Sequence, residues 1–331
     1  MTDRSSLLQQ WLAHAGYRDY HLQPASEDAS FRSYLRLDTS SGSFIIMDAP
    51  PAQEPCDRFI SVAGKIRAAG LNAPEIIDTN LDDGFLLLTD FGSEDYLSIL
   101  NEETAGRLYA DALDALLVMQ REIDPREQPP YDEALLLREM DLFHDWFLLQ
   151  LLGLQLDEPQ QALWNEARQV LVDNALAQPR VFVHRDYHSR NLMVLAEGNP
   201  GILDFQDAMN GPVTYDLVSL LRDCYIAWPQ AWIDQQVMDF HARMLDAGLI
   251  TVTAEEFHRW FNLMGVQRHL KAVGIFSRLK IRDGKQRYLA DIPRTLGYIH
   301  QVSRDEPSLA GLAKLLDELQ LEPRIEAILD A

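Results

Sequence analysis

Two stretches of sequence, VFVHRDYHSRNLMV at residues 181–194 and GILDF at residues 201–205, decide the fold of this chain. They are typical of a strand, a polar loop, a second strand, a turn and a third strand that leads to Asp204. The last two strands are short enough to pair as a hairpin, which would bring Asp204 back beside Asn191. The sequence therefore predicts that an amide oxygen and a carboxylate converge at this hairpin.

The convergence of these two groups suits phosphoryl transfer. An amide oxygen and a carboxylate can hold a hard divalent ion that nucleotide phosphates bring in. Asp186 precedes Asn191 by five residues in the polar loop, where its carboxylate can accept a proton from an attacking hydroxyl. Asp and Asn also cap loops, but here His184 precedes Asp186 by two residues and an apolar strand leads in. This context favours a kinase-type catalytic loop.

The other polar side chains of the loop leave more than one interpretation open. We expect His184 to pack behind the loop and not to act as a base. His188 can face the acceptor or only cap the loop. Arg190 stands next to Asn191, so it can contact substrate, contact the transferred phosphate, or lie in a structural or surface position.

Composition excludes several classes of partner. The chain has 331 residues, of which 47% are hydrophobic, enough for a real core. Its formal net charge of -22 argues against a nucleic-acid partner, because phosphate backbones favour clustered Lys and Arg. No apolar stretch reaches the length of a membrane span. Cys56 and Cys224 lie far apart without metal-ligand spacing, which predicts buried thiols in a reducing compartment and a cytoplasmic protein.

A small β-rich N-lobe is predicted for residues 1–92. An Asp-Gly pair between two apolar segments predicts a hairpin at Asp83 and Gly84. Short segments rich in aromatic and aliphatic residues predict further strands at residues 20–24, 31–37 and 43–47.

A larger helical C-lobe is predicted for residues 93–331. Apolar residues recur at helical intervals in the segments 104–122, 132–152 and 158–177, and again from residue 215 to the end. The chain is therefore expected to be α+β, with the polar loop and its hairpin inserted among the helices.

The run from Val181 to Tyr225 resembles the aminoglycoside phosphotransferase and choline kinase superfamily, and the likeness spans nearly the whole chain. Three stretches are similar, more narrowly, to bacterial N-acetylmuramate/N-acetylglucosamine anomeric kinases. They are SFIIMDAPP at 43–51, FLLLTDFG at 85–92 and YDLVSLLRDCY at 215–225. The resemblance implies a bilobal protein-kinase-like fold with an antiparallel-sheet N-lobe.

The same resemblance implies an activity. Enzymes of this kind use ATP and Mg²⁺ to phosphorylate the C1 hydroxyl of a salvaged cell-wall amino sugar. Their product goes to a sugar-1-phosphate nucleotidyltransferase that makes the UDP-sugar, bypassing early steps of peptidoglycan precursor synthesis. The implied partners are thus a small amino sugar and, functionally, that nucleotidyltransferase.

Site roles can be carried over position by position. Asp186 matches the catalytic base or hydroxyl-orienting residue, and Asn191 and Asp204 match the Mg²⁺ ligands. Asp216 opens a helix and matches the superfamily Asp that braces the loop from behind, with His184 as a second structural support. A carboxylate at a helix N-terminus is the ordinary alternative for Asp216 and is compatible with the same position.

The hinge and phosphate-binding parts match less fully. The stretch around Leu88 and Asp90 matches the hinge whose backbone would hydrogen-bond adenine, although an apolar core strand fits it too. The third strand lacks the usual kinase Lys, and the loop at residues 24–30 contains no Gly. Arg32 and Arg36, four residues apart and expected on one face of a strand, are the candidates for holding the phosphates; an exposed arginine pair is the alternative.

Acceptor recognition is assigned to His188, Arg190 and Arg222, because an arginine would pair with the carboxylate of N-acetylmuramate. Aromatic residues just beyond Arg222 can stack on a sugar ring or belong to the core. Two other functions stay open: a kinase of another hydroxylated small molecule, such as an aminoglycoside, choline or a different sugar, and a nucleotide-binding pseudokinase.

Overall fold

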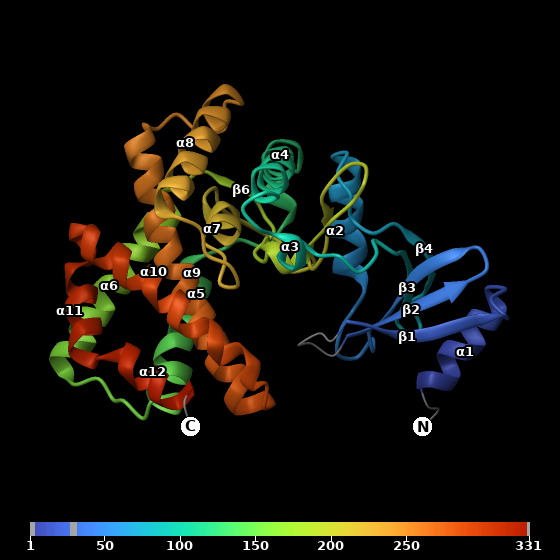
Figure 1. Ribbon diagram of the computed structural model, residues 1–331, viewed down its shortest axis with the longest axis horizontal. Coiled ribbons are helices and arrows are strands. Elements are labelled where there is room, and N and C mark those ends of the chain that lie inside the picture. The colour runs from blue at the N-terminus through green and yellow to red at the C-terminus, as the bar shows by residue number, and fades with distance from the viewer. Residues whose placement is uncertain (1–3, 27–31, 330–331) are drawn as a thin grey trace. The chain divides into compact units, whose positions relative to one another are not determined.

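The computed structural model describes residues 4–26 and 32–329, which form two compact units (Figure 1). The first unit takes in the described residues up to 112, together with residues 190–207. The second takes in residues 113–189 and those from 208 onward. A five-stranded antiparallel sheet in the first unit and a mostly helical second unit confirm the predicted α+β class.

The sheet of the first unit has the strand order β1-β2-β3-β5-β4, and every neighbouring pair is antiparallel. The predicted Asp-Gly hairpin joins β4 to β5, and Gly84 has a φ of +77°. A Cβ at Gly84 would lie 2.0 Å from the carbonyl oxygen of Ala49, so only glycine fits there. The strands are β1 (Tyr20–Ser26), β2 (Ser33–Thr39), β3 (Gly42–Asp48), β4 (Ile76–Asn80) and β5 (Phe85–Thr89).

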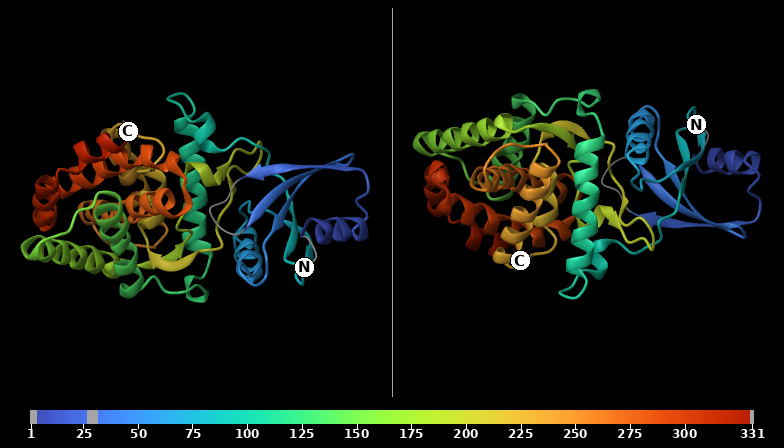
Figure 2. Two further views of the ribbon diagram at one scale, coloured as in Figure 1. Left: turned by 90° about the horizontal axis from the view of Figure 1, so that it is seen from below. Right: turned by 90° about the horizontal axis from the view of Figure 1, so that it is seen from above.

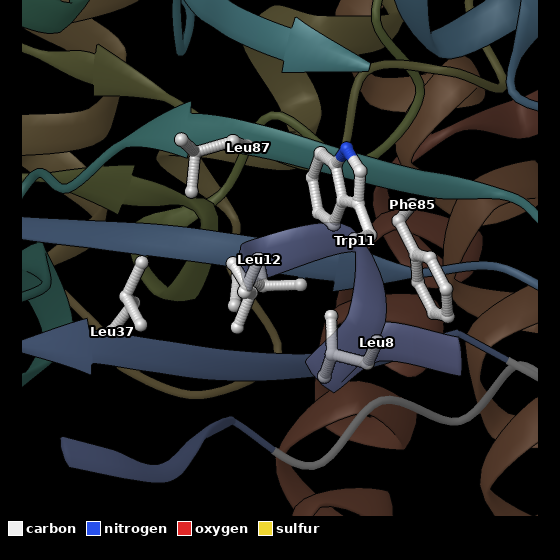
Figure 3. Packing of buried hydrophobic residues seen from close by; sticks show 7 residues of the cluster. Leu8, Trp11, Leu12, Leu37, Phe85 and Leu87 are labelled. Atoms are coloured by element: carbon white, nitrogen blue, oxygen red, sulfur yellow. The ribbon is translucent and has the colours of Figure 1, made fainter. Parts of the chain in front are cut away.

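Helix α1 (Arg4–His14) covers one face of this sheet (Figure 3). The ring of Trp11 stacks on that of Phe85 with centroids 5.7 Å apart and 15° between the planes. Alternate residues of a strand point to opposite faces, and the intervening Leu86 and Leu88 are also buried, so β5 is covered on both sides. The cluster under α1 consists of Leu8, Trp11, Leu12, Leu37, Ile46, Phe85 and Leu87.

A short hairpin of β7 (Leu192–Met193) and β8 (Gly201–Ile202) belongs to the first unit. The amide of Ile202 donates to the carbonyl of Asn72 at 2.7 Å, and that of Val194 donates to the carbonyl of Glu94 at 2.9 Å. These bonds attach a segment distant in sequence to the first unit. The division therefore differs from the lobe boundary predicted at residue 92. Helices α2 (Asp57–Ala68) and α3 (Tyr96–Ile99) complete this unit, and α4 (Ala105–Glu122) continues into the second.

The second unit is built around α9 (Ala254–Asp283), a 30-residue helix that contacts most of the other helices of the unit. A Cβ at Gly274 would lie 2.3 Å from the backbone of Leu142, the last residue of α5, so α9 and α5 approach closely at this glycine. Helix α6 and the late helix α11 lie side by side although they are far apart in sequence (Figure 2). The helices are α5 (Glu133–Leu142), α6 (Glu158–Ala177), α7 (Tyr215–Leu221), α8 (Gln230–Asp246), α10 (Ile292–Asp305), α11 (Ala310–Leu319) and α12 (Leu321–Leu329), with short turns η1 (Pro125–Glu127), η4 (Gln286–Asp291) and η5 (Pro307–Leu309).

Two features of the second unit differ from the sequence-based expectation. The helix predicted over residues 132–152 is α5 followed by a wider π-helix, η2 (Phe143–Leu151), because periodicity alone does not separate the two helix types. A strand that the sequence did not indicate, β9 (Met209–Pro212), pairs with β6 (Arg180–Val183). Most of the glycine-free loop at residues 24–30 lies outside the described residues. Within 4–26 and 32–329, no helix combines the length and apolarity needed to cross a membrane.

Candidate active site

The loop that carries Asp186, residues 184–189, follows β6 and is held by the carboxylate of Asp216. One oxygen of Asp216 accepts the backbone N–H of His184 at 2.6 Å, and the other accepts that of Arg185 at 2.9 Å. Asp216 is fully buried in the first turn of α7. Arg185 has a φ of +79°, which is unfavourable for a residue with a side chain, so the surrounding contacts must enforce it. Asp216 thus fixes the backbone immediately before Asp186.

Asp186 itself is half-buried at the start of the polar turn. Its backbone N–H donates to Nδ1 of the fully buried His184 at 3.3 Å, and its carbonyl accepts the N–H of His188 at 3.1 Å. Burial raises the pKa of the Asp186 carboxyl, but the charges of Lys271, His188 and Arg185 outweigh that effect and lower it to about 2. The side chain is therefore a carboxylate throughout the neutral range.

A buried cluster of charges lies behind this loop. Glu139 of α5 pairs with Arg185, and it also pairs with Lys271 of α9, whose Nζ lies 3.4 Å from the carboxylate. Lys271 donates to the hydroxyl of Tyr215 at 3.0 Å. Burial raises the pKa of Glu139, but Lys271 and Arg185 outweigh it, so the pKa is lowered and Glu139 stays charged. One carboxylate therefore pairs with two cations, the buried Lys271 and the half-buried Arg185, which makes Glu139 hard to replace.

The far end of the loop is held by Asp223, just beyond α7. One carboxylate oxygen accepts both the backbone N–H of Ser189 at 3.0 Å and its hydroxyl at 2.5 Å. The other accepts the backbone N–H of Tyr225 at 2.9 Å. The Tyr225 ring meets the His188 ring edge-on, with centroids 5.3 Å apart. Asp223 thus ties a half-buried aromatic side chain to the loop that carries Asp186.

The first unit holds the other two predicted residues, Asn191 and Asp204. Asn191 ends the short turn η3 (Ser189–Asn191), and its carbonyl accepts the N–H of Leu203 at 2.9 Å, which extends the β7–β8 pairing. Its Nδ2 lies 3.3 Å from Oδ2 of Asp204, so the hairpin brings the amide and the carboxylate together. Asp204 has a φ of +60°. A carboxylate and an amide side by side offer the oxygen donors that Mg²⁺ prefers, so these residues fit such an ion.

The four residues assigned to nucleotide binding also lie in the first unit. Arg36 binds the carboxylate of Asp90 at 2.6 and 3.1 Å and the carbonyl of Gly92 at 2.7 Å. Arg32 pairs with Glu54 at 3.6 Å. Arg32 immediately precedes β2, which begins at Ser33 and carries Arg36. Leu88 is buried near the end of β5, the strand that lies between β3 and β4.

The predicted acceptor residues differ in their surroundings. Arg190 is half-buried in η3. Arg222, at the end of α7, is only 3% exposed; its Nη2 donates to Oδ1 of Asn262 at 2.7 Å, and its guanidinium lies over the ring of Phe261. Burial lowers the pKa of Arg222 to about 10. Among the residues that the structure describes, no carboxylate pairs with this buried guanidinium.

Sequence reasoning missed several supporting residues, namely Glu139, Lys271 and Gln206, and did not assign Asp223 its role. Glu139 and Lys271 reach the loop from helices 46 or more residues away in the chain. No local motif marks them; only the rarity of buried charge inside a helix would have pointed to them.

Several known proteins resemble this chain in sequence. A model of the phosphotransferase enzyme family matches residues 21–250. A protein of Pseudomonas putida named N-acetylmuramate/N-acetylglucosamine kinase is 48% identical over 92% of this chain and 89% of its own length. A protein of the same name from Neisseria meningitidis serogroup B is 42% identical over 93% of both chains.

Solved structures resemble it in fold. The ADP-bound aminoglycoside phosphotransferase APH(2'')-Ib superposes with a TM-score of 0.59 at 12% identity, over 89% of this chain and 97% of its own. A choline kinase from Streptococcus pneumoniae superposes with a TM-score of 0.58 at 9% identity, over 90% and 99%. At such identities the likeness establishes the fold alone.

Proposed function

The chain belongs to the phosphotransferase enzyme family, and from that membership we propose that it transfers a phosphoryl group from ATP to the anomeric C1 hydroxyl of N-acetylmuramate, N-acetylglucosamine or both. The choice of sugar is supported by the relatives at 42–48% identity, which are named N-acetylmuramate/N-acetylglucosamine kinase. The observation that carries the reaction type is the loop of Asp186, fixed from behind by Asp216 and followed in the chain by the paired Asn191 and Asp204.

In this proposal Asp186 orients the attacking hydroxyl and accepts its proton as the bond to phosphorus forms. Its pKa of about 2 makes it a weak base, so its main contribution is to hold the hydroxyl in line. Asp216 and Asp223 keep the loop in place at its two ends. The charges of Arg185 and Lys271, themselves balanced by Glu139, keep Asp186 ionised.

Asn191 and Asp204 would hold Mg²⁺ in the working enzyme. When bound, that ion would neutralise the charge on the transferred phosphate group. Leu88 and Asp90 are proposed to form the adenine hinge through their backbone. Arg32 and Arg36 would be the phosphate-side cations, but Arg36 reaches a phosphate only if its bonds to Asp90 and Gly92 open.

On the acceptor side we assign His188 and Arg190 to the sugar, with Tyr225 as an added aromatic surface beside His188. Arg222 would meet a carboxylate only after a rearrangement of its buried surroundings. The product is proposed to feed a nucleotidyltransferase in cell-wall recycling, and the site of action is proposed to be the cytoplasm.

The proposal is tested by measuring ATP consumption with N-acetylmuramate, N-acetylglucosamine, other hexosamines, choline and aminoglycosides. Turnover with the two named sugars is expected. Turnover with only the cationic acceptors would replace the sugar kinase by the second candidate, a kinase of another hydroxylated compound. ATP binding without turnover on any acceptor would favour a pseudokinase.

A further inference from the structure

The side chain of Gln206 lies in direct contact with the carboxylate of Asp204. Its Nε2 donates to Oδ1 of Asp204 at 2.7 Å, while Asn191 donates to Oδ2 of the same carboxylate at 3.3 Å. Two neutral amides therefore flank one charged carboxylate, and each lies within hydrogen-bond distance of a different carboxylate oxygen. The assigned metal pair thus has a third polar neighbour that no motif indicated.

The carbonyl oxygen of the same side chain has nothing to bind. Gln206 is 7% exposed, and its Oε1 is buried without a hydrogen-bond partner among the described residues. Buried polar atoms of native proteins nearly always have a hydrogen-bond partner. The unpaired Oε1 of Gln206, next to the charged Asp204, therefore indicates a partner that does not come from the protein itself. An oxygen acceptor in this position can be satisfied by a cation or by a water attached to one.

The surroundings hold this side chain in place. The backbone carbonyl oxygen of Gln206 accepts the Nε–H of Arg58 from α2 at 2.9 Å. The preceding residue, Phe205, is fully buried, and its ring packs on Phe59 of the same helix with centroids 4.9 Å apart. Residue 206 is thus fixed on both sides, and its amide is presented to Asp204 by a rigid backbone. Such support is what a metal-binding side chain requires.

The available donors also limit how a cation can bind here. Within the described part of the chain, no three His, Cys, Asp or Glu side chains gather into a metal-binding group. A hard divalent cation at Asp204 must therefore take amide oxygens, phosphate oxygens or water as its other ligands. Asn191 supplies one amide, and the side-chain oxygen of Gln206, whose Nε2 already contacts Asp204, is a candidate for a second.

We propose that Gln206 is a third protein group of the divalent-cation site, with Oε1 as an oxygen ligand beside Asn191 and Asp204. This inference rests on the proposed function only in taking Asn191 and Asp204 as the cation site; it does not depend on the identity of the sugar. It predicts that changes at residue 206 alter cation binding in the absence of any acceptor.

The test is Mn²⁺ binding followed by electron paramagnetic resonance, with a non-hydrolysable ATP analogue and no sugar. Gln206→Met keeps the length of the side chain and removes its oxygen, so the Mn²⁺ affinity should fall about 10- to 100-fold. Gln206→Glu distinguishes a residue that binds the cation from one that only donates a hydrogen bond to Asp204. A ligand role predicts affinity equal to or above that of the wild type, because glutamate supplies oxygen and charge. A donor role predicts weaker binding, because glutamate repels Asp204.

Gln120→Met is the matched control. Gln120 is also buried, at 3% exposed; its Nε2 donates to a carbonyl at 3.0 Å and its Oε1 likewise lacks a partner, but no carboxylate accepts from it. It should bind Mn²⁺ as the wild type does. Wild-type affinity in Gln206→Met, an equal loss in Gln120→Met, or weakened binding in Gln206→Glu would each overturn the inference. A wild-type protein that binds Mn²⁺ yet phosphorylates neither sugar would instead count against the proposed function.

Discussion

Replacing Asp216 by asparagine removes one of the two acceptors that hold the backbone before Asp186. The aspartate accepts the N–H groups of His184 and Arg185 at 2.6 and 2.9 Å, and it is fully buried. Asparagine keeps one oxygen but turns an NH₂ group toward the other N–H. One bond to a charged acceptor is lost, and one buried N–H is left without a partner.

At pH 8, where the Asp216 carboxyl is ionised, such a loss costs about 2–3 kcal/mol, because bonds to charged groups contribute at the upper end of the hydrogen-bond range. For a unit of roughly 200 residues this lowers the thermal midpoint by about 4–12 °C. The catalytic effect should be larger. If Arg185 leaves its positive φ, Asp186 moves with it, and a displacement of about 1 Å costs on the order of 10²-fold in rate.

The stability difference should also depend on pH. Burial raises the pKa of Asp216 to about 7, although its two backbone hydrogen bonds act against this. Because this folded-state pKa lies above the unfolded value, the stability that Asp216 contributes is full below about pH 4 and is lost as the pH rises through 7. Asparagine does not titrate, so the gap between wild type and Asp216→Asn should widen when the pH falls from 8 to 5.

The assay combines steady-state kinetics with thermal unfolding at pH 5 and pH 8. The control is Asp157→Ala, which removes the N-cap of α6 and the bond to the N–H of Gln160 at 2.9 Å. It should cost about 1 kcal/mol and leave kcat unchanged. If Asp216→Asn loses stability but keeps a wild-type kcat, Asp216 does not position Asp186. A gap that stays constant with pH would refute the raised pKa.

Three further outcomes are expected. Asp186→Asn should lower kcat by about 10²- to 10⁴-fold while Mg-ATP binding, measured by calorimetry, stays close to that of the wild type; lost nucleotide binding would contradict its role as base. Lys271→Met removes a charge that lowers the pKa of Asp186 against the effect of burial, so the acid limb of the kcat/KM profile should move to higher pH; an unmoved limb would show that Lys271 does not act on Asp186. Trp11→Ala should destabilise the first unit by about 3–5 kcal/mol, because it removes the stack on Phe85; denaturant unfolding followed by circular dichroism measures this, and a loss below about 1 kcal/mol would mean that α1 contributes little.

The part of the site nearest the catalytic motif could be predicted from the sequence because its geometry is local. Asn191 and Asp204 meet through a hairpin of two short strands, and hairpin pairing follows from spacing and turn residues. Asp216 could be assigned only by resemblance, since its bonds to the loop span 32 and 31 residues. Glu139 and Lys271 could not be predicted, because helix–helix packing decides which helix faces meet, and periodicity leaves that open.

The fold shows the same limit. Helix and strand positions such as α6 and β3 follow from apolar periodicity and turn residues. The π-helix η2 and the strand β9 do not, because both depend on tertiary contacts: η2 packs on α9, and β9 pairs with β6. Arg36 is an example for a side chain. The sequence made it a candidate for phosphate binding, but in the structure its guanidinium pairs with Asp90, 54 residues away.

The most direct test of the central claim is the position of the phosphate on the product. The protein is incubated with Mg-ATP and N-acetylglucosamine or N-acetylmuramate, and the product is examined by correlated phosphorus and proton NMR. The account predicts a phosphorus resonance coupled to the anomeric proton of the sugar, which appears about 10²- to 10⁴-fold more slowly with Asp186→Asn. A phosphate coupled to protons at any other carbon, or no phosphorylated sugar from either acceptor, would contradict it.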